Sequence, residues 1–464
     1  MNTPGRRGAA PPAAPRLGPL AGPLLAELVL GMAVGLVGTA LAASQSDTHA
    51  AAFALVQQVV ATLFVLFRIL GAGVSVVVAQ ELGAGRGAQA VQVARSVLGA
   101  SSWMGLLAAM LTALTAPLLL AVFQAPADVR ALALPLLWWM APILLLDGWT
   151  ACGASVLRAH LRTRETLGVI LLMHLLALAV ALWAMPRWGL AGFAVAQLVS
   201  RVLAAALLAW LWRRSLGIAL SVGGAWRFSW AHLRPVLRIG LPGAAENIAW
   251  RLAFMVSVVV AAQLGTQALA VQSYVLQIMM LILLSALALG LSVEIVVGHL
   301  VGAGQLRRAH RLVKKALLLG WCLSLLLAGS AALAGPWLMR QFSGDAQLVA
   351  LGAVLLWWTV LLEPGRTFNL VVINGLRAAG DARYPFVAGV GSMLVVLAGG
   401  SWLRGIGLGW GLVGVWLAYA ADEWLRGLLM WRRWVSLKWV PHARAARRRR
   451  LAAARQGVSP VDPG

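Results

Sequence analysis

The sequence predicts an all-α polytopic membrane protein whose twelve transmembrane helices form two parallel six-helix repeats. The first observation behind this prediction is composition: 61% of the 464 residues are hydrophobic and only 11% are charged. Such a chain cannot cover a soluble globule with polar surface. The second observation is a regular series of long apolar runs, and the third is that the two halves of the chain match each other.

The apolar runs set the number of helices. A helix needs about 20 residues to cross roughly 30 Å of hydrocarbon, and twelve runs reach this length, six in each half. We predict the spans at residues 17–43, 50–80, 94–123, 129–157, 166–185, 189–212, 236–263, 270–299, 314–337, 347–374, 384–404 and 409–430.

The match between the halves has a constant offset. Pro23 corresponds to Pro242, an offset of 219 residues (242 − 23), and Glu27 corresponds to Glu246. The same offset relates Gly83-Ala84-Gly85 to Gly302-Ala303-Gly304, Trp138-Trp139 to Trp357-Trp358, and Leu157-Arg158-Ala159 to Leu376-Arg377-Ala378. After an insertion the offset becomes 222, as for Trp188 and Trp410 (410 − 188). An even number of spans per half makes the repeats parallel, which suits alternating access by rocking of one half against the other.

Charge and composition predict the domain order and the topology. The net charge is +24, but the basic residues gather on one predicted side of the membrane, so the charge indicates orientation rather than nucleic-acid binding. We therefore expect a multi-pass protein of a bacterial-type plasma (inner) membrane with both termini in the cytoplasm. The basic tail also suits anionic membrane lipids, although a plain topology signal with a disordered end is the favoured explanation. The predicted segments are a cytoplasmic N-terminal segment 1–16, an N-terminal lobe 17–212, a linker 213–235 with an interfacial amphipathic stretch, a C-terminal lobe 236–434 and a tail 435–464.

Enzymatic and ATP-driven functions find no support in the motifs. The phosphate-binding pattern GxxxxGK[ST] is missing, and no nucleophile and base stand at helical spacing. Cys152 and Cys322 lie alone in apolar runs and predict neither a disulfide nor a metal site. We therefore expect no cofactor, an ion gradient as the energy source, and a protein that acts as a monomer.

Glu27 and Glu246 are the first candidate site residues, because a carboxylate inside a bilayer is costly unless it is paired or protonated. Each follows a proline by four residues and lies about 15 Å into its helix, which predicts a position near the midplane. Such a group can exchange H⁺ or Na⁺, and Asn247 can add a carbonyl ligand. A structural tie to Arg68 or Arg251 is an equal alternative.

Further charges lie in the tenth, eighth and twelfth runs. Pro364 interrupts the tenth helix between Glu363 and Arg366, which share one helix face. Arg366 is the repeat equivalent of Asp147 (366 − 147 = 219), so a lock between the lobes and a role in the substrate cavity are both open. The remaining candidates are Asn369 for the cavity, Asp422 and Glu423 with Arg426 for either a structural network or the cavity, and Glu294 with His299 for either a proton relay or an interfacial position.

Several of these segments resemble one family. They are Ile239-Gly240-Leu241-Pro242, AQELGAGRGAQA, VGHLVGAGQLRRA and LLEPGRTFNLVVINGLRAAGDARYP, and their order resembles the multidrug and toxic compound extrusion (MATE) family over about residues 17–435. The resemblance implies two six-helix lobes in a V and export of organic cations or amphipathic compounds in exchange for H⁺ or Na⁺. Two family acids are replaced, by Gly38 in the first span and Trp250 in the seventh, so the resemblance points to Glu27, Glu246 and Asn247 as substitutes.

The expected function is therefore secondary active efflux of organic cations or amphipathic drugs by antiport with H⁺ or Na⁺. We expect ion coupling at Glu27, Glu246, Asn247 and Glu294, and a substrate cavity at Asp147, Glu363, Arg366, Asn369, Asp422 and Glu423. The alternative is a flippase of a lipid-linked saccharide or another amphipathic lipid precursor. A flippase is expected to line its cavity with positive charge, which the buried acids of this chain disfavour.

Overall fold

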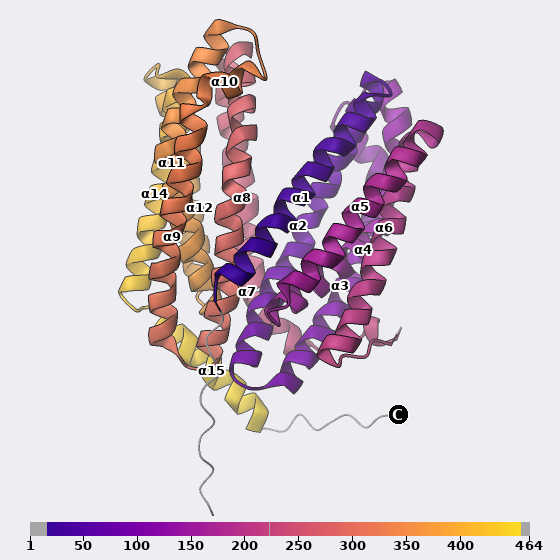
Figure 1. Cartoon of the computed structure of the whole chain (residues 1–464), viewed down its shortest axis with the longest axis vertical. Coiled ribbons are helices and arrows are strands. Elements are labelled where there is room, and N and C mark those ends of the chain that lie inside the picture. Colours follow the sequence, from indigo (N-terminus) through magenta and orange to yellow (C-terminus); the bar gives the residue numbers. More distant parts are fainter. Residues whose placement is uncertain (1–15, 222, 456–464) are drawn as a thin grey trace, which may run out of the picture.

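The fold was obtained as a computed structural model that describes residues 16–221 and 223–455, and these residues form helices and short connections. Two lobes diverge from a narrow end to a wide end, in a V (Figure 1). The first lobe contains α1 (Gly18–Ala43), α2 (Asp47–Gly83), α3 (Gly87–Val122), α4 (Ala127–Ala159), α5 (Thr163–Trp188) and α6 (Leu190–Leu216). The second contains α7 (Trp230–Gln263), α8 (Thr266–Gly302), α9 (Leu306–Leu333), α10 (Gly335–Arg340), α11 (Ala346–Ala378), α12 (Arg383–Ser392) with its continuations η2 (Met393–Gly399), α13 (Gly400–Trp402) and η3 (Leu403–Gly407), and α14 (Gly411–Val435).

Among the described residues, eleven helical segments are long and apolar enough to cross a membrane. The predicted twelfth span is α14, which has the length but not the apolar composition, because it carries Asp422, Glu423 and Arg426 on one buried face and Arg432 and Arg433 in its last turn. The predicted eleventh span is one continuous helical segment from Arg383 to Gly407. Two stretches of it, η2 and η3, are π-helical.

Helices extend past the predicted apolar runs, most clearly at the narrow end. The helix α9 begins at Leu306 and so includes Arg307, Arg308 and Arg311, which the apolar pattern excluded. Between α6 and α7 the described residues contain one short turn, η1 (Gly224–Trp226), and α7 begins at Trp230, inside the predicted linker. The Ser102 hydroxyl and the Trp103 indole donate hydrogen bonds to carbonyls of this turn, so the connection lies on α3.

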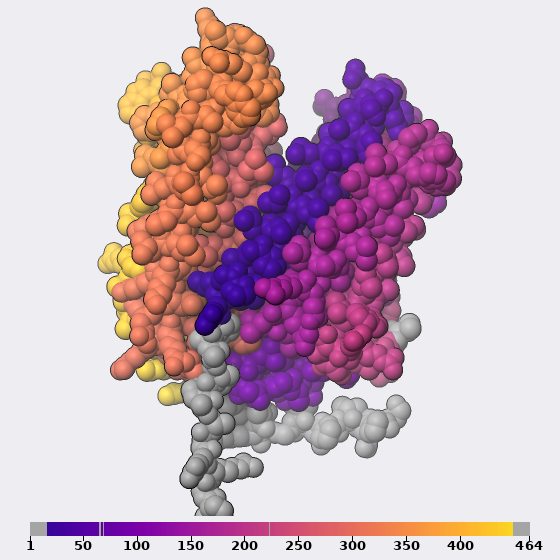
Figure 2. Space-filling model, in the orientation of Figure 1, coloured from indigo at the N-terminus to yellow at the C-terminus, as the bar shows by residue number. Residues whose placement is uncertain are grey.

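Helices α2 and α8 cross at the narrow end, where the two lobes touch. A Cβ at Gly83 of α2 would collide with the backbone carbonyl of His299, and a Cβ at Gly302 of α8 would collide with the carbonyl of Gln80. Because 302 − 83 = 219, the repeat places a glycine at each side of the same crossing. Only glycine permits this backbone approach. Above the crossing, Figure 2 shows the surface hollowed between the lobes.

The start of α1 also belongs to the contact between lobes. Leu20 and Leu24 pack into the hydrophobic core of the second lobe with Val293 and Leu300 of α8. Farther along, α1 packs on α5 and α2 of its own lobe (Figure 1). Leu28 also packs against the second-lobe core, and Thr163 of α5 donates a hydrogen bond to the carbonyl of Pro19, so the part of α1 around Glu27 contacts both lobes.

Candidate functional site

Glu27 and Glu246 each form an ion pair with an arginine, and the two pairs are repeat equivalents. The Glu27 carboxylate lies 3.6 Å from Nε of Arg158, and the Glu246 carboxylate lies 2.6 Å from Nη2 of Arg377. Arg158 and Arg377 are themselves separated by 219 positions (377 − 158). The glutamates are 9% and 6% exposed, so both pairs are largely removed from solvent.

These partners differ from the arginines that the sequence suggested. Neither Arg68 nor Arg251 is the partner found here: Arg251 is exposed, and the side chain of Arg68 lies outside the described part of the structure. Arg158 and Arg377 occupy the last turns of α4 and α11, which end at the narrow end. The two glutamates therefore lie beside the last turns of α4 and α11, toward the narrow end.

A reciprocal pair of hydrogen bonds joins the lobes one residue beyond these arginines. Gln80 of α2 donates from Nε2 to the carbonyl of Ala378 in the second lobe, at 2.5 Å. His299 of α8 donates from Nε2 to the carbonyl of Ala159 in the first lobe, at 2.8 Å. Both donors and both acceptors are related by the repeat, since 299 − 80 and 378 − 159 are each 219. We call these two bonds the latch.

Three further candidate residues, His299, Glu294 and Asn247, lie on the helices next to the latch. The sequence predicts for His299 either a proton relay with Glu294 or a position at the membrane interface, and the structure shows that its side chain bonds across the lobes. Glu294 is buried in α8, at 2% exposure. Asn247 bonds back to the carbonyl of Gly243 in its own helix, at 2.8 Å.

The predicted lock between Asp147 and Arg366 is wrong. Asp147 pairs with Arg201 of α6 at 3.1 Å, and Arg366 pairs with Glu423 of α14 at 3.6 Å, each within one lobe. The two pairs are equivalent, because Asp147 corresponds to Arg366 (offset 219) and Arg201 to Glu423 (offset 222). Each lobe therefore has one equivalent ion pair. The acid lies on α4 and the arginine on α6 in the first lobe, whereas the arginine lies on α11 and the acid on α14 in the second. The partner is near because α4 packs on α6 and α11 packs on α14.

The second lobe adds charges that the first does not have. Glu363 lies 2.6 Å from Nη1 of Arg366 and is fully buried. Arg426 lies 2.8 Å from both Asp422 and Glu423, and Ser392 donates a hydrogen bond to Asp422 at 2.6 Å. In the first lobe the corresponding positions hold Leu144, Ser200 and Ala204. We call Glu363, Arg366, Asp422, Glu423 and Arg426 the C-lobe network; its three carboxylates face two guanidinium groups.

The C-lobe network leaves buried oxygen atoms without a hydrogen-bond partner. They are Oε2 of Glu363, Oδ1 of Asn369 and Oγ1 of Thr367, all on α11. Asn369 donates a hydrogen bond from Nδ2 to Glu423, at 3.0 Å, and its side-chain carbonyl oxygen takes no part in that bond. Such oxygens suit a proton or a hard cation such as Na⁺. The excess of one carboxylate would be neutralised by one such cation.

The two positions where the resemblance implies acids hold aromatic packing. A Cβ at Gly38 would lie 3.2 Å from the ring of Phe53, which packs edge-on against Phe193 with ring centroids 4.8 Å apart. Trp250 stacks on Phe254 at 5.1 Å, and Phe254 stacks on Tyr419 at 6.0 Å. Gly38 and Trp250 therefore both lie against aromatic side chains.

Comparisons with known proteins agree on a single family. A family model described as MatE matches residues 23–183 and 242–402, and these matches repeat the offset of 219 (242 − 23). A Bacillus subtilis (strain 168) protein described as the uncharacterized transporter YisQ is 29% identical over 415 residues, 88% of this chain and 91% of that protein. A probable multidrug resistance protein NorM from Bradyrhizobium diazoefficiens is 28% identical over 414 residues, 85% of this chain and 87% of that protein. The solved structure of a MATE protein in the bent conformation superposes with a TM-score of 0.85 at 18% identity, over 93% of this chain and 96% of that chain.

Proposed function

Because the chain belongs to the MatE family and is a multi-pass membrane transporter rather than an enzyme, we propose that it exports organic cations or amphipathic drugs by antiport with H⁺ or Na⁺. Relatives described as probable multidrug resistance proteins support the substrate class. The observation that carries the proposal is the C-lobe network, in which three buried carboxylates face two guanidinium groups. A buried charge without a partner costs several kcal/mol, so a coupling cation has a reason to bind here.

In this proposal Glu363, Asn369, Asp422 and Glu423 hold the coupling ion, and Arg366 sets the charge balance. Glu363 is the best candidate ligand, because one of its oxygens bonds Arg366 while the other has no hydrogen-bond partner. A proton or Na⁺ at this oxygen weakens the attraction of Glu363 for Arg366. Arg366 then pairs more strongly with Glu423, 3.6 Å away, and pulls on α14.

Glu27 and Glu246 act at the gate in this proposal. Their arginine partners are adjacent in sequence to Ala159 and Ala378, whose carbonyls accept the latch bonds. Protonation of either glutamate frees an arginine at the end of α4 or α11 and so loosens the latch. Asn247 and Glu294 lie on α7 and α8, the helices that carry Glu246 and His299, and assist the gate.

The narrow end faces the cytoplasm in this proposal, so the V is open to the outside. Basic side chains gather where the helices meet at that end, which follows the positive-inside rule. They include Arg162 and Arg164 before and in α5, Arg213 and Arg214 in the last turn of α6, and Arg307 and Arg308 in the first turn of α9. Both chain termini then lie in the cytoplasm.

The test is efflux of ethidium from proteoliposomes under an imposed H⁺ or Na⁺ gradient. Wild-type efflux should follow one of the two gradients, and Glu363→Gln should abolish that dependence. The matched control is Glu165→Gln, since Glu165 also pairs with an arginine three residues away, Arg162, but outside the C-lobe network. Gradient-driven efflux that survives Glu363→Gln unchanged contradicts the proposed ion site. No efflux under either gradient from correctly inserted wild type favours the lipid-linked saccharide flippase instead.

A further inference from the structure

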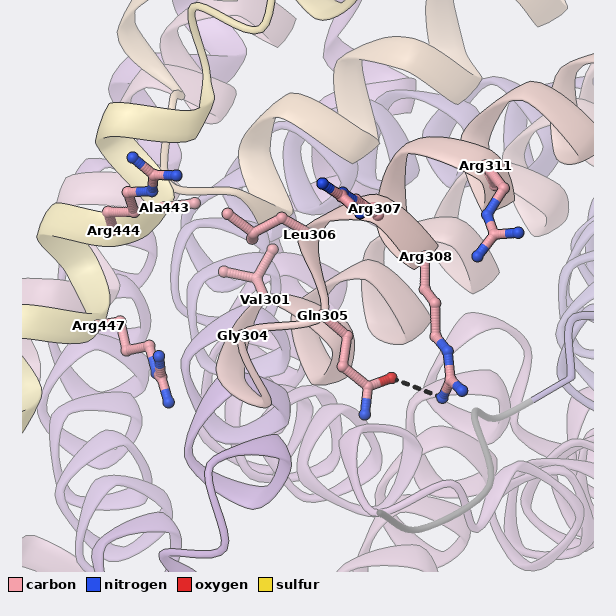
Figure 3. A pocket seen from close by; sticks show the side chains of 10 residues that line it. All are labelled: Val301, Gly304, Gln305, Leu306, Arg307, Arg308, Arg311, Ala443, Arg444 and Arg447. Carbon is pink, nitrogen blue, oxygen red and sulfur yellow. Dashed lines mark hydrogen bonds between the residues drawn. The ribbon is translucent and has the colours of Figure 1, made fainter. Parts of the chain in front are cut away.

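A pocket of about 600 Å³ at the narrow end is lined by five arginines from two helices. Arg307, Arg308 and Arg311 come from the first turns of α9, and Arg444 and Arg447 come from α15 (Val440–Arg455). Figure 3 shows the two groups on opposite sides of Val301 and Leu306, which form the apolar part of the wall. The pocket therefore joins the α8–α9 turn to a helix that follows the last span.

The helix α15 is held in place by specific contacts, so the pocket is a built feature of the lobe. Trp439, just before α15, is fully buried and stacks on Trp434 with ring centroids 4.3 Å apart. Ala443 on the pocket side of α15 is buried in the core of the second lobe. On the α11–α12 turn, Asp381 pairs with Arg433 at 2.8 Å, and Arg433 in turn contacts His442 of α15 at 3.2 Å.

The charge in the pocket is not balanced by the described residues. No carboxylate lines it, and the one hydrogen bond drawn among its side chains runs from Arg308 to the amide oxygen of Gln305, at 2.9 Å (Figure 3). The start of α9 adds the positive end of a 28-residue helix, which has no side-chain cap. Gly304, with a φ of +75°, brings the backbone of the turn close to the Arg447 guanidinium, which lies 3.1 Å from the position of an added Cβ. Guanidinium groups on two sides of a helix N-terminus match the oxygens of a phosphate.

We propose that this pocket binds the phosphate group of an anionic membrane lipid. The lipid is favoured over a free anion because Val301 and Leu306 lie at the ends of the membrane-spanning helices α8 and α9. At that level a headgroup phosphate reaches the arginines while the glycerol and acyl chains contact apolar wall. The bound lipid links α15 to the turn that follows Gly302, the residue of α8 packed against α2 at the crossing.

The test measures lipid binding to the delipidated full-length protein in detergent. Short-chain phosphatidylglycerol, short-chain phosphatidylcholine and inorganic phosphate are titrated separately, and binding is followed by microscale thermophoresis. The variant Arg307→Gln/Arg447→Gln removes one arginine from each side of the pocket. The control Arg213→Gln/Arg214→Gln removes the same charge from the exposed end of α6, also at the narrow end.

Wild type should bind phosphatidylglycerol more tightly than phosphatidylcholine, and the control should behave like wild type. An arginine near an anionic headgroup is worth about fivefold in affinity, so the pocket variant should bind phosphatidylglycerol about 25-fold more weakly. If the control loses as much affinity for phosphatidylglycerol as the pocket variant, general surface charge explains the binding and the proposal is overturned. Binding of inorganic phosphate as tight as that of phosphatidylglycerol would overturn the assignment to a lipid.

Discussion

Removing the latch should open the narrow end. The perturbation is Gln80→Leu with His299→Leu, which deletes both hydrogen-bond donors across the lobes and keeps the side chains large and apolar. The matched control is Gln45→Leu. Gln45 also donates from Nε2 to a helix carbonyl, that of Met185, at 2.9 Å, but both residues belong to the first lobe.

The expected change in the ratio of closed to open molecules follows from the number of hydrogen bonds removed. One such hydrogen bond contributes about 1 kcal/mol net, and more when its carbonyl is left buried without a donor. Two bonds across the lobes therefore favour the closed narrow end by about 2 kcal/mol, which is roughly 30-fold in the ratio of closed to open molecules. Gln45→Leu loses a comparable bond but should leave this ratio unchanged, because its bond does not cross between the lobes.

Distances between spin labels report the ratio directly. Labels at Arg164→Cys on α5 and Lys315→Cys on α9 occupy exposed positions on different lobes near the narrow end. Cys322 is exposed and is replaced by Ser, whereas Cys152 is buried and unreactive. The latch variant should shift the distance distribution from short to long. If the latch variant and Gln45→Leu give the same distribution as wild type, the two bonds do not hold the gate and the reasoning fails.

Three further outcomes are expected. Glu246→Gln leaves the Arg377 guanidinium buried without its partner and should lower stability by about 3–5 kcal/mol, whereas Glu246→Gln/Arg377→Gln should recover most of the loss in a thermal-unfolding assay. Charge reversal Asp147→Arg/Arg201→Asp should preserve folding better than either single change, and Asp147→Arg/Arg366→Asp should give no such rescue, as judged by monodisperse yield. Gly302→Ala should prevent close approach of α2 and α8 and reduce ethidium efflux, while Gly329→Ala, whose Cβ meets nothing within 4 Å, should not.

The sequence was sufficient for the helices because spans are fixed by a local quantity, the length of an apolar run. It failed at span ends, where charged residues such as Arg307 continue a helix that hydropathy alone cannot follow. It also named most charged residues of the site and correctly grouped Glu363 with Arg366 and Asp422 with Arg426, which lie within one helix, but it missed the partners on other helices. Asp147 pairs with a residue of α6 and Arg366 with a residue of α14. Which residues pair depends on which helices pack together, and the sequence does not show that directly. The pairing of Glu27 with Arg158 could have been inferred, since both residues recur at one offset.

The repeat separates two kinds of residue in this protein. Those that obey it form the contact between the lobes, where we propose the gate: the glycines of the crossing, the latch, and the glutamate–arginine pairs next to it occur once per lobe. Two lobes that rock against each other need matched contacts, because each contact closes one side of the same pseudo-symmetric interface. The C-lobe network breaks the repeat, because Glu363, Asp422 and Arg426 of the second lobe replace Leu144, Ser200 and Ala204 of the first. In the proposed antiport, the coupling ion has to act on one lobe differently from the other to drive a symmetric gate in one direction. The C-lobe network supplies such a difference in charge between the lobes.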